Sequence, residues 1–148
     1  MIDSTDIKIL NSLLTNSRQS TKALAEPLDI SNVATQQRID KLEKNGIILN
    51  YTALLDYKAL GYNTIAFVGI FLVKARDYPD VVAQLRNVPQ ITEAYFTTGN
   101  YSIFTKIYAK NNHHLMQILS QEVQLIEGVA RTETFICLEE GANRAMLL

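Results

Sequence analysis

The sequence predicts an α+β protein in two parts: a helical N-terminal part and a C-terminal part built on an antiparallel sheet. Apolar residues recur at helical spacing through the first 45 residues. From residue 63 onward, runs of β-branched and aromatic residues alternate with two helical segments in the order βαββαβ. That order is the ferredoxin-like arrangement. The pattern changes at Gly61, so we expect one domain over residues 1–61 and a second over residues 62–148.

Three helices are expected in the N-terminal part. Asp3, Ser20 and Ser31 each precede a helical segment and are residue types that favour the N-cap position. Pro27 should shorten the second helix to a turn or two, and Gly46 suits the left-handed position that ends the third. The buried face of the third helix is expected to be Thr35, Ile39 and Leu42.

A segment rich in apolar residues connects the two parts. Ile47–Ile48 and Tyr51–Leu55 are predicted as short strands, and Asp56–Leu60 as a single turn that Gly61 ends. The segment is not rich in glycine and serine. We therefore expect an ordered connection rather than a loose tether.

The C-terminal part should contain four strands and two helices. The strands are predicted at Thr64–Ala75, on both sides of the turn within Thr92–Ile107, and at Val129–Leu138; the helices are predicted at Asp77–Val88 and Asn111–Gly128.

The first strand of the predicted sheet carries apolar residues on both of its faces. Phe67 and Phe71 alternate with Val68 and Ile70, whereas a sheet with one face in water should alternate apolar with polar residues. Helices of a ferredoxin-like fold cover only one face. We expect the same face of a second copy to cover the other, giving a homodimer, and a monomer with an unusually apolar sheet is the alternative.

The bulk composition is that of an ordinary globular protein. The 148 residues are 47% hydrophobic and 20% charged, with a net charge of −1. No apolar run reaches the roughly 18 residues of a membrane helix, and no signal peptide is evident, so a cytoplasmic location is expected. Cys137 is the only cysteine and therefore forms no internal disulfide. With His113 and His114 as the only histidines, we expect no metal site and no cofactor.

The three predicted helices resemble a winged helix-turn-helix, whose third helix enters the DNA major groove. Glutamine amides on that helix suit adenine, basic side chains suit phosphates, and the helix start offers backbone N–H groups. Residues 1–50 hold six basic and six acidic residues, so DNA binding must rest on a local basic patch. The alternative is that the polar face of the third helix is simply solvated and binds no DNA. The DNA-binding candidates are Arg18, Ser31, Asn32, Gln36, Gln37, Arg38 and Lys41.

The hairpin "TEAYFTTGNYSIFTKI" (Thr92–Ile107) carries more hydroxyls than a turn requires. Gly99 lets the backbone come close to a ligand, so that N–H groups can meet a carboxylate. The neighbouring hydroxyls can hold an ammonium or an amide. The alternative is a plain Gly-Asn turn in which threonines are simply good strand residues.

Motifs along nearly the whole chain resemble the Lrp/AsnC family of transcription regulators. In the N-terminal half the resemblance rests on "DSTDIKIL" (Asp3–Leu10) and "LDISNVATQQRIDKLEKNGII" (Leu28–Ile48). In the C-terminal half it rests on "DYP" (Asp77–Pro79), the hairpin, and "TETFICL" (Thr132–Leu138). Ser102 after the hairpin tyrosine is similar to the asparagine-responsive branch, where many relatives have Asp.

The resemblance implies a DNA-binding half joined to an amino-acid-sensing half, with dimers that assemble into octamers. It implies that double-stranded promoter DNA and a small amino acid are the partners, with asparagine the leading effector. The hairpin loop and the segment that leads into the last strand are the walls of the effector site in this family. The matching positions are Thr97, Thr98, Gly99, Asn100, Tyr101, Ala130, Arg131 and Thr132.

Several residues depart from the family pattern. Asp29 stands where the helix-turn-helix usually has a glycine, and Thr35 replaces a larger apolar residue. Arg131 belongs to a "VART" stretch that replaces a Gln-Ser pair of that branch, and it could pair with a carboxylate. An oligomeric amino-acid sensor with a degenerate helix-turn-helix therefore stays open. A sirohaem-decarboxylase-like enzyme is a remoter alternative, since no nucleophile or phosphate-loop motif is present and we expect no enzyme.

Overall fold

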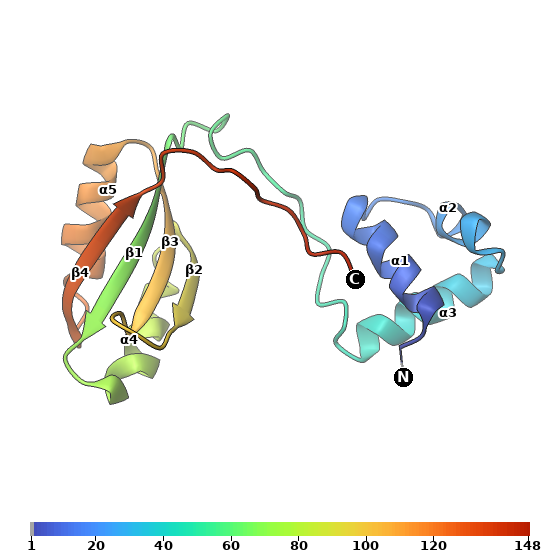
Figure 1. Cartoon of the computed structure of the whole chain (residues 1–148), viewed down its shortest axis with the longest axis horizontal. Helices are drawn as coiled ribbons and strands as arrows, with labels where there is room; N and C mark the ends of the chain where they lie inside the picture. The colour runs from blue at the N-terminus through green and yellow to red at the C-terminus, as the bar shows by residue number, and fades with distance from the viewer. Residues whose placement is uncertain (1) are drawn as a thin grey trace. The chain divides into compact units, whose positions relative to one another are not determined.

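The computed structural model of the chain describes residues 2–148 and divides into two compact units (Figure 1). The first unit contains the residues up to Leu54 together with Ala142–Leu148, and the second contains Leu55–Gly141. Each unit has a hydrophobic core of its own. The structure groups residues 55–61 with the second unit, and the domain boundary expected after Gly61 stays a prediction.

The first unit contains the three predicted helices: α1 (Ser4–Thr15), α2 (Thr21–Ala25) and α3 (Asn32–Lys44). The predicted caps are confirmed, because the side chains of Asp3, Ser20 and Ser31 each accept a hydrogen bond from a backbone N–H of the first turn. Pro27 lies in a single 3-10 turn that follows α2, as its effect on that helix predicted. The short second helix therefore follows from local sequence.

The turn before α3 contains a strained residue. Asp29 has φ of 52°, in the left-handed region that a glycine would enter more readily. It ends the 3-10 turn and accepts this conformation while Ile9, Leu24 and Ile39 pack into the small core. The helix-turn-helix is therefore formed although Pro27 shortens its second helix and Asp29 replaces the usual glycine.

The predicted strands at Ile47–Ile48 and Tyr51–Leu55 are not formed, and this expectation was wrong. A strand is stable only when a neighbouring strand accepts and donates its backbone hydrogen bonds. Residues 49–56 have no regular structure, and no other strand of residues 2–148 pairs with them. The predicted turn is confirmed: the Ala59 N–H donates to Asp56 Oδ1 at 3.0 Å, and Gly61 follows with φ of 88°.

The second unit is a four-stranded antiparallel sheet with strand order β2-β3-β1-β4. The strands are β1 (Thr64–Leu72), β2 (Ile91–Phe96), β3 (Ile103–Ala109) and β4 (Val129–Ile136). The helices are α4 (Tyr78–Leu85) and α5 (Asn112–Ile118), and a π-helical turn (Leu119–Val123) continues α5. This is the predicted βαββαβ order, with helices shorter than the sequence pattern suggested because their ends wind into 3-10, π and turn geometry.

One face of the sheet carries the core. Val68 and Ile70 of β1 and Ile103 and Ile107 of β3 are completely buried with apolar residues of α4 and α5. The other face carries rings from several strands, among them Phe67, which lies parallel to Phe104 with ring centroids 6.0 Å apart. Within the second unit, none of the described helices contributes to a core on this second face, which we call the open face.

No helix in the described part of the chain has both the length and the apolar character needed to cross a membrane.

Candidate functional site

Helix α3 presents a polar face away from the core of its unit. Its predicted inward residues are confirmed as buried: Thr35, Ile39 and Leu42. On the other side the first three turns expose Asn32, Gln36, Gln37 and Lys41 together with Val33. At the helix start the side chain of Ser31 is the N-cap: its Oγ accepts a hydrogen bond from the Ala34 N–H at 3.1 Å. These four predicted DNA-binding residues of α3 therefore share one exposed surface of the helix.

The amide group of Gln36 is held in place by two neighbours. The Thr21 hydroxyl donates to Gln36 Oε1 at 3.0 Å, and Gln36 Nε2 donates to Asp40 Oδ1 at 2.7 Å. Each end of the amide keeps one further hydrogen-bonding position. Thr21 belongs to α2 and Asp40 to α3, so this chain of bonds also connects the two helices of the helix-turn-helix. The sequence reasoning missed both partners. The bond to Thr21 spans 15 residues and leaves no periodic signal, whereas Asp40 follows Gln36 by four residues and could have been found from helical spacing.

Arg38 lies in an ion cluster rather than on the polar face. Its Nη1 is 2.7 Å from Asp3 Oδ2 and 2.7 Å from Asp6 Oδ1, and Asp6 is buried. Asp3 and Asp6 also form the capping box at the start of α1. Arg38 thus holds α1 against α3, and its predicted phosphate contact would require these two bonds to break.

Acidification is expected to loosen this cluster. The hydrogen bond from Arg38 lowers the pKa of Asp3 below its ordinary 3.8. Burial raises the pKa of Asp6, but hydrogen bonds from the Asp3 N–H and from Arg38 outweigh it, so the pKa of Asp6 is lowered as well. A carboxyl group whose folded pKa is depressed stabilises the fold above its unfolded pKa. This stabilisation should be complete above about pH 4 and be lost as pH falls through the folded values.

Thermal unfolding followed by circular dichroism at several acidic pH values checks this prediction. The first unit of the wild-type chain should lose several degrees of melting temperature on acidification. Arg38→Met should melt lower at neutral pH and show a weaker pH dependence, because its two carboxylates have lost their partner. Lys41→Met, which removes an exposed charge of the same helix, is the matched control. Equal pH dependence in the wild type and Arg38→Met would contradict the assignment.

The remaining DNA-binding candidate, Arg18, lies between α1 and α2. Its backbone N–H donates to Asn16 Oδ1 at 3.0 Å, which fixes the local turn, and the residue is exposed. The structure does not place Arg18 on α3 with the other candidates.

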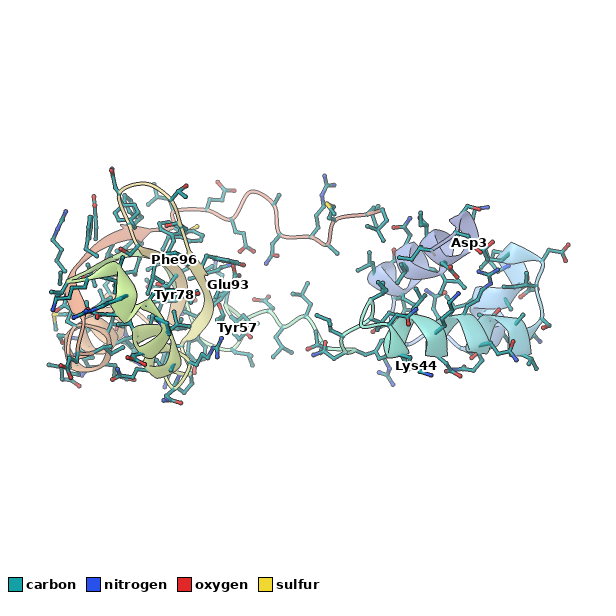
Figure 2. All side chains as sticks on the ribbon, turned by 90° about the horizontal axis from the view of Figure 1, so that it is seen from below. Asp3, Lys44, Tyr57, Tyr78, Glu93 and Phe96 are labelled. Carbon is teal, nitrogen blue, oxygen red and sulfur yellow. The ribbon has the colours of Figure 1, made fainter. Side chains whose placement is uncertain are left out.

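The predicted hairpin joins β2 to β3, and its base is tightly held. The Thr97 N–H donates to the Ser102 carbonyl at 3.1 Å, and Thr97 Oγ1 donates to the Tyr101 carbonyl at 2.8 Å. Figure 2 shows Tyr78 of α4 beside Phe96 at the end of β2, with ring centroids 4.3 Å apart. Gly99 at the tip has φ of 111°, which favours glycine. The exposed backbone of Thr98, Gly99 and Asn100 is thus presented from a rigid base.

The ring of Tyr101 lies on the open face instead of extending from the loop. It covers Gly69 of β1, where even a methyl group would overlap the ring. Its hydroxyl donates to Glu133 Oε2 at 3.0 Å, and its ring meets that of Phe71 edge to face at 5.2 Å between centroids. Burial, and then the bond to Glu133, raise the pKa of the Tyr101 hydroxyl, so the group is a neutral donor at neutral pH.

Two of the three predicted residues of β4, Arg131 and Thr132, lie on opposite faces of the sheet. Arg131 is on the open face, with its guanidinium carbon 3.5 Å from the ring centroid of Phe71. Thr132 pairs in register with the buried Ile70, and its hydroxyl accepts from Gln124 Nε2 at 2.9 Å. Ala130 lies at a register shift, because Phe71 pairs with Arg131 and Leu72 pairs with Val129, and it is exposed.

The structure therefore brings Tyr101 and Arg131 together around Phe71 and places Thr132 on the opposite face. Sequence reasoning missed Phe71, Glu133 and Gln124 as neighbours of these positions. The alternation of side chains along a strand would have separated Arg131 from Thr132. It would also have grouped Glu133 with Arg131.

Comparison with known proteins assigns a family to both units. Residues 65–146 match the Lrp/AsnC ligand binding domain, and residues 2–48 match a winged helix-turn-helix DNA-binding domain. The chain belongs to the Lrp/AsnC family. As the family implies, it is a DNA-binding transcription regulator with an amino-acid-binding domain and is not an enzyme.

Relatives in the Lrp/AsnC family match along nearly the full chain. Regulatory protein AsnC of Escherichia coli K12 is 36% identical over 146 residues, 99% of this chain and 96% of the relative. The HTH-type transcriptional regulator FL11 of Pyrococcus furiosus is 34% identical over 139 residues, 94% of this chain and 91% of the relative.

Solved structures of the Lrp/AsnC family have the same fold. That of E. coli AsnC aligns with a TM-score of 0.94 at 35% identity, covering 100% of this chain and 99% of that one. The Neisseria meningitidis regulator NMB0573, solved in complex with L-Met, aligns with a TM-score of 0.92 at 26% identity. That alignment covers 97% of this chain and 94% of the Neisseria chain.

Proposed function

We propose that this regulator binds promoter DNA in a sequence-specific way and that a small amino acid, with asparagine the leading candidate, changes its occupancy. The observation that carries the effector proposal is the position of Tyr101, which follows the hairpin loop and contacts Gly69 of β1 and Glu133 of β4. Through that ring a ligand at the loop would contact β1 and β4 at once. The likeness to AsnC along the whole chain supports asparagine, and the L-Met complex of the Neisseria regulator supports an amino acid.

The exposed face of α3 is the proposed DNA-contacting surface. Gln36 and Gln37 would bond base edges, Lys41 and Arg18 would contact phosphates, and the backbone of Ser31 and Asn32 would approach a phosphate at the helix start. The bonds from Thr21 and Asp40 would orient the Gln36 amide before DNA arrives. Such pre-organisation lowers the entropy lost on binding.

The groups around the hairpin suit an α-amino acid. Backbone N–H groups of the loop from Thr98 to Tyr101 and the guanidinium of Arg131 are donors for a carboxylate. The carboxylate of Glu133, which already accepts from Tyr101, is an acceptor for an ammonium. The site thus offers opposite charges within one cluster of side chains. Thr97 at the base of the hairpin completes the proposed wall on this side. Thr132, which the family resemblance also implied, lies on the opposite face of the sheet and is not part of this cluster.

Homodimers that assemble into octamers are proposed as the working form. Tyr95 and Phe135 lie on the open face, on the two edge strands β2 and β4, and are 56% and 43% exposed, a large aromatic exposure for one face of a sheet. The open face of a second copy would cover these rings and complete a two-layer sandwich. In this assembly the hairpin corners of neighbouring dimers would form the effector pockets.

Thermal shift of the full chain against each of the twenty amino acids tests the effector proposal. A ligand at about a hundred times its dissociation constant stabilises by about 2.7 kcal/mol, which raises the melting temperature of a domain of this size by about 10–20 °C. Tyr101→Ala should erase the shift, and the same amino acid should change the retardation of promoter DNA by the wild type only.

The matched control is Tyr95→Phe. Tyr95 also lies on the open face and donates its hydroxyl to a neighbouring carboxylate, that of Glu93, at 3.0 Å. Tyr95→Phe should keep the ligand-induced shift, while Tyr101→Phe should weaken it by freeing Glu133. The effector proposal is rejected if no amino acid shifts the melting temperature, or if Tyr101→Ala responds like the wild type.

A further inference from the structure

Val33 lies in the first turn of α3, on the exposed face that is proposed to contact DNA. At about 100° per residue, it lies nearly opposite the buried side chains of Thr35, Ile39 and Leu42. Its side chain is 67% exposed, and it is the only large apolar residue of this helix that is exposed. Gln36 and Gln37 follow it by three and four residues and are therefore its neighbours on the helix surface.

The fold of the unit does not require a valine at this position. Val33 makes no contribution to the buried cluster around Ile9. A β-branched residue also lowers helix propensity relative to alanine, and an exposed apolar group is hydrated at a cost. The outward face of an ordinary surface helix is polar. Binding therefore offers a better reason for Val33 than folding does.

We propose that Val33 contacts the C5-methyl group of a thymine and so selects a T·A base pair at one position of each half-site. In the major groove that methyl group is the only apolar feature that a base presents, and an apolar side chain beside it excludes water. Gln37 lies one turn further along the same surface and would bond the edge of a neighbouring adenine. This inference rests on the proposed placement of α3 in the major groove.

Removal of the methyl group from the DNA gives a direct test. The probe is a duplex selected from a random pool by the full-length wild-type chain. Each thymine in a half-site is replaced in turn by deoxyuridine, which pairs identically but lacks the C5-methyl. At the contacted position, deoxyuridine should weaken wild-type binding about fourfold per half-site, the effect of one buried methyl-sized group. Val33→Ala should weaken binding to the unmodified duplex to a similar extent.

The decisive result is the combination of the two changes. Val33→Ala should lose nothing further on the deoxyuridine duplex, because protein and DNA have lost the same contact. Val73→Ala, which truncates a 62% exposed valine outside the helical unit, should bind both duplexes like the wild type. Alanine raises helix propensity, so α3 stays folded in the variant, and circular dichroism confirms that point.

Two results overturn the inference while leaving DNA binding intact. In the first, no thymine of the selected site responds to deoxyuridine. In the second, the losses from Val33→Ala and from deoxyuridine simply add. Failure to select any duplex from the pool is a different outcome, which would reject the proposed sequence-specific function together with this inference.

Discussion

Replacing Ile9 by alanine is expected to unfold the helical unit and to abolish DNA binding. Ile9 is completely buried, and the cluster around it contains only two other buried apolar residues, Leu24 and Ile39. An isoleucine-to-alanine change in a core costs about 2–5 kcal/mol. So small a unit is marginally stable, so this loss removes most or all of its stability.

Circular dichroism and DNA retardation measure the effect of Ile9→Ala. The helical signal of the first unit should fall at room temperature, and retardation should disappear. Sedimentation should still report the wild-type oligomer, because the sheet has a separate core. Ile7→Ala is the matched control: Ile7 lies on the same helix but is 37% exposed, and it should lose far less stability. Full DNA affinity in Ile9→Ala would show that the small cluster does not support α3.

Gly69→Ala is expected to displace Tyr101 and to remove the response to the effector. A β-carbon at residue 69 would overlap the Tyr101 ring, so the ring must leave the open face and its bond to Glu133 must break. Overpacking of this kind costs about 1–3 kcal/mol. The proposed effector site then loses the side chain that connects the hairpin to β1 and β4.

Calorimetric unfolding of single and double variants tests whether the destabilisation comes from the overlap between a β-carbon at residue 69 and the Tyr101 ring. Gly69→Ala and Tyr101→Ala should each destabilise the sheet unit. The double variant should be more stable than the sum of the two losses predicts, since the added methyl group then meets no ring. Gly141→Ala, where a β-carbon would meet nothing within 4 Å, should change little. Strictly additive losses would mean that residue 69 and Tyr101 do not interact.

Local features of this protein could be predicted from the sequence because their causes are local. A helix cap joins residues two or three positions apart, so Asp3, Ser20 and Ser31 were predictable. The hairpin turn at Gly99 and the βαββαβ order likewise follow from short patterns. The strand at Tyr51–Leu55 failed for the opposite reason: its composition favours a strand, but a strand also needs a distant partner.

Each candidate site also combines features that local sequence predicts with contacts between residues far apart in the sequence. The polar surface of α3 was visible from helical periodicity, but the engagement of Arg38 by Asp3 and Asp6 joins residues more than 30 positions apart. The hairpin was visible from its residue types, but the position of the Tyr101 ring depends on Gly69, which belongs to another strand.

By itself, the amino-acid sequence determined the order of the helices and of the strands of the sheet, the helix caps, the exposed polar surface of α3 and the family of the chain. Helical and strand periods, capping and turn chemistry act over a few residues and can be read along the chain. Only the tertiary structure decided which charged and aromatic side chains meet: Arg38 with α1, Tyr101 and Arg131 around Phe71, and Thr132 on the opposite face. Such contacts depend on strand register and helix packing, which bring together residues that no short stretch of sequence contains.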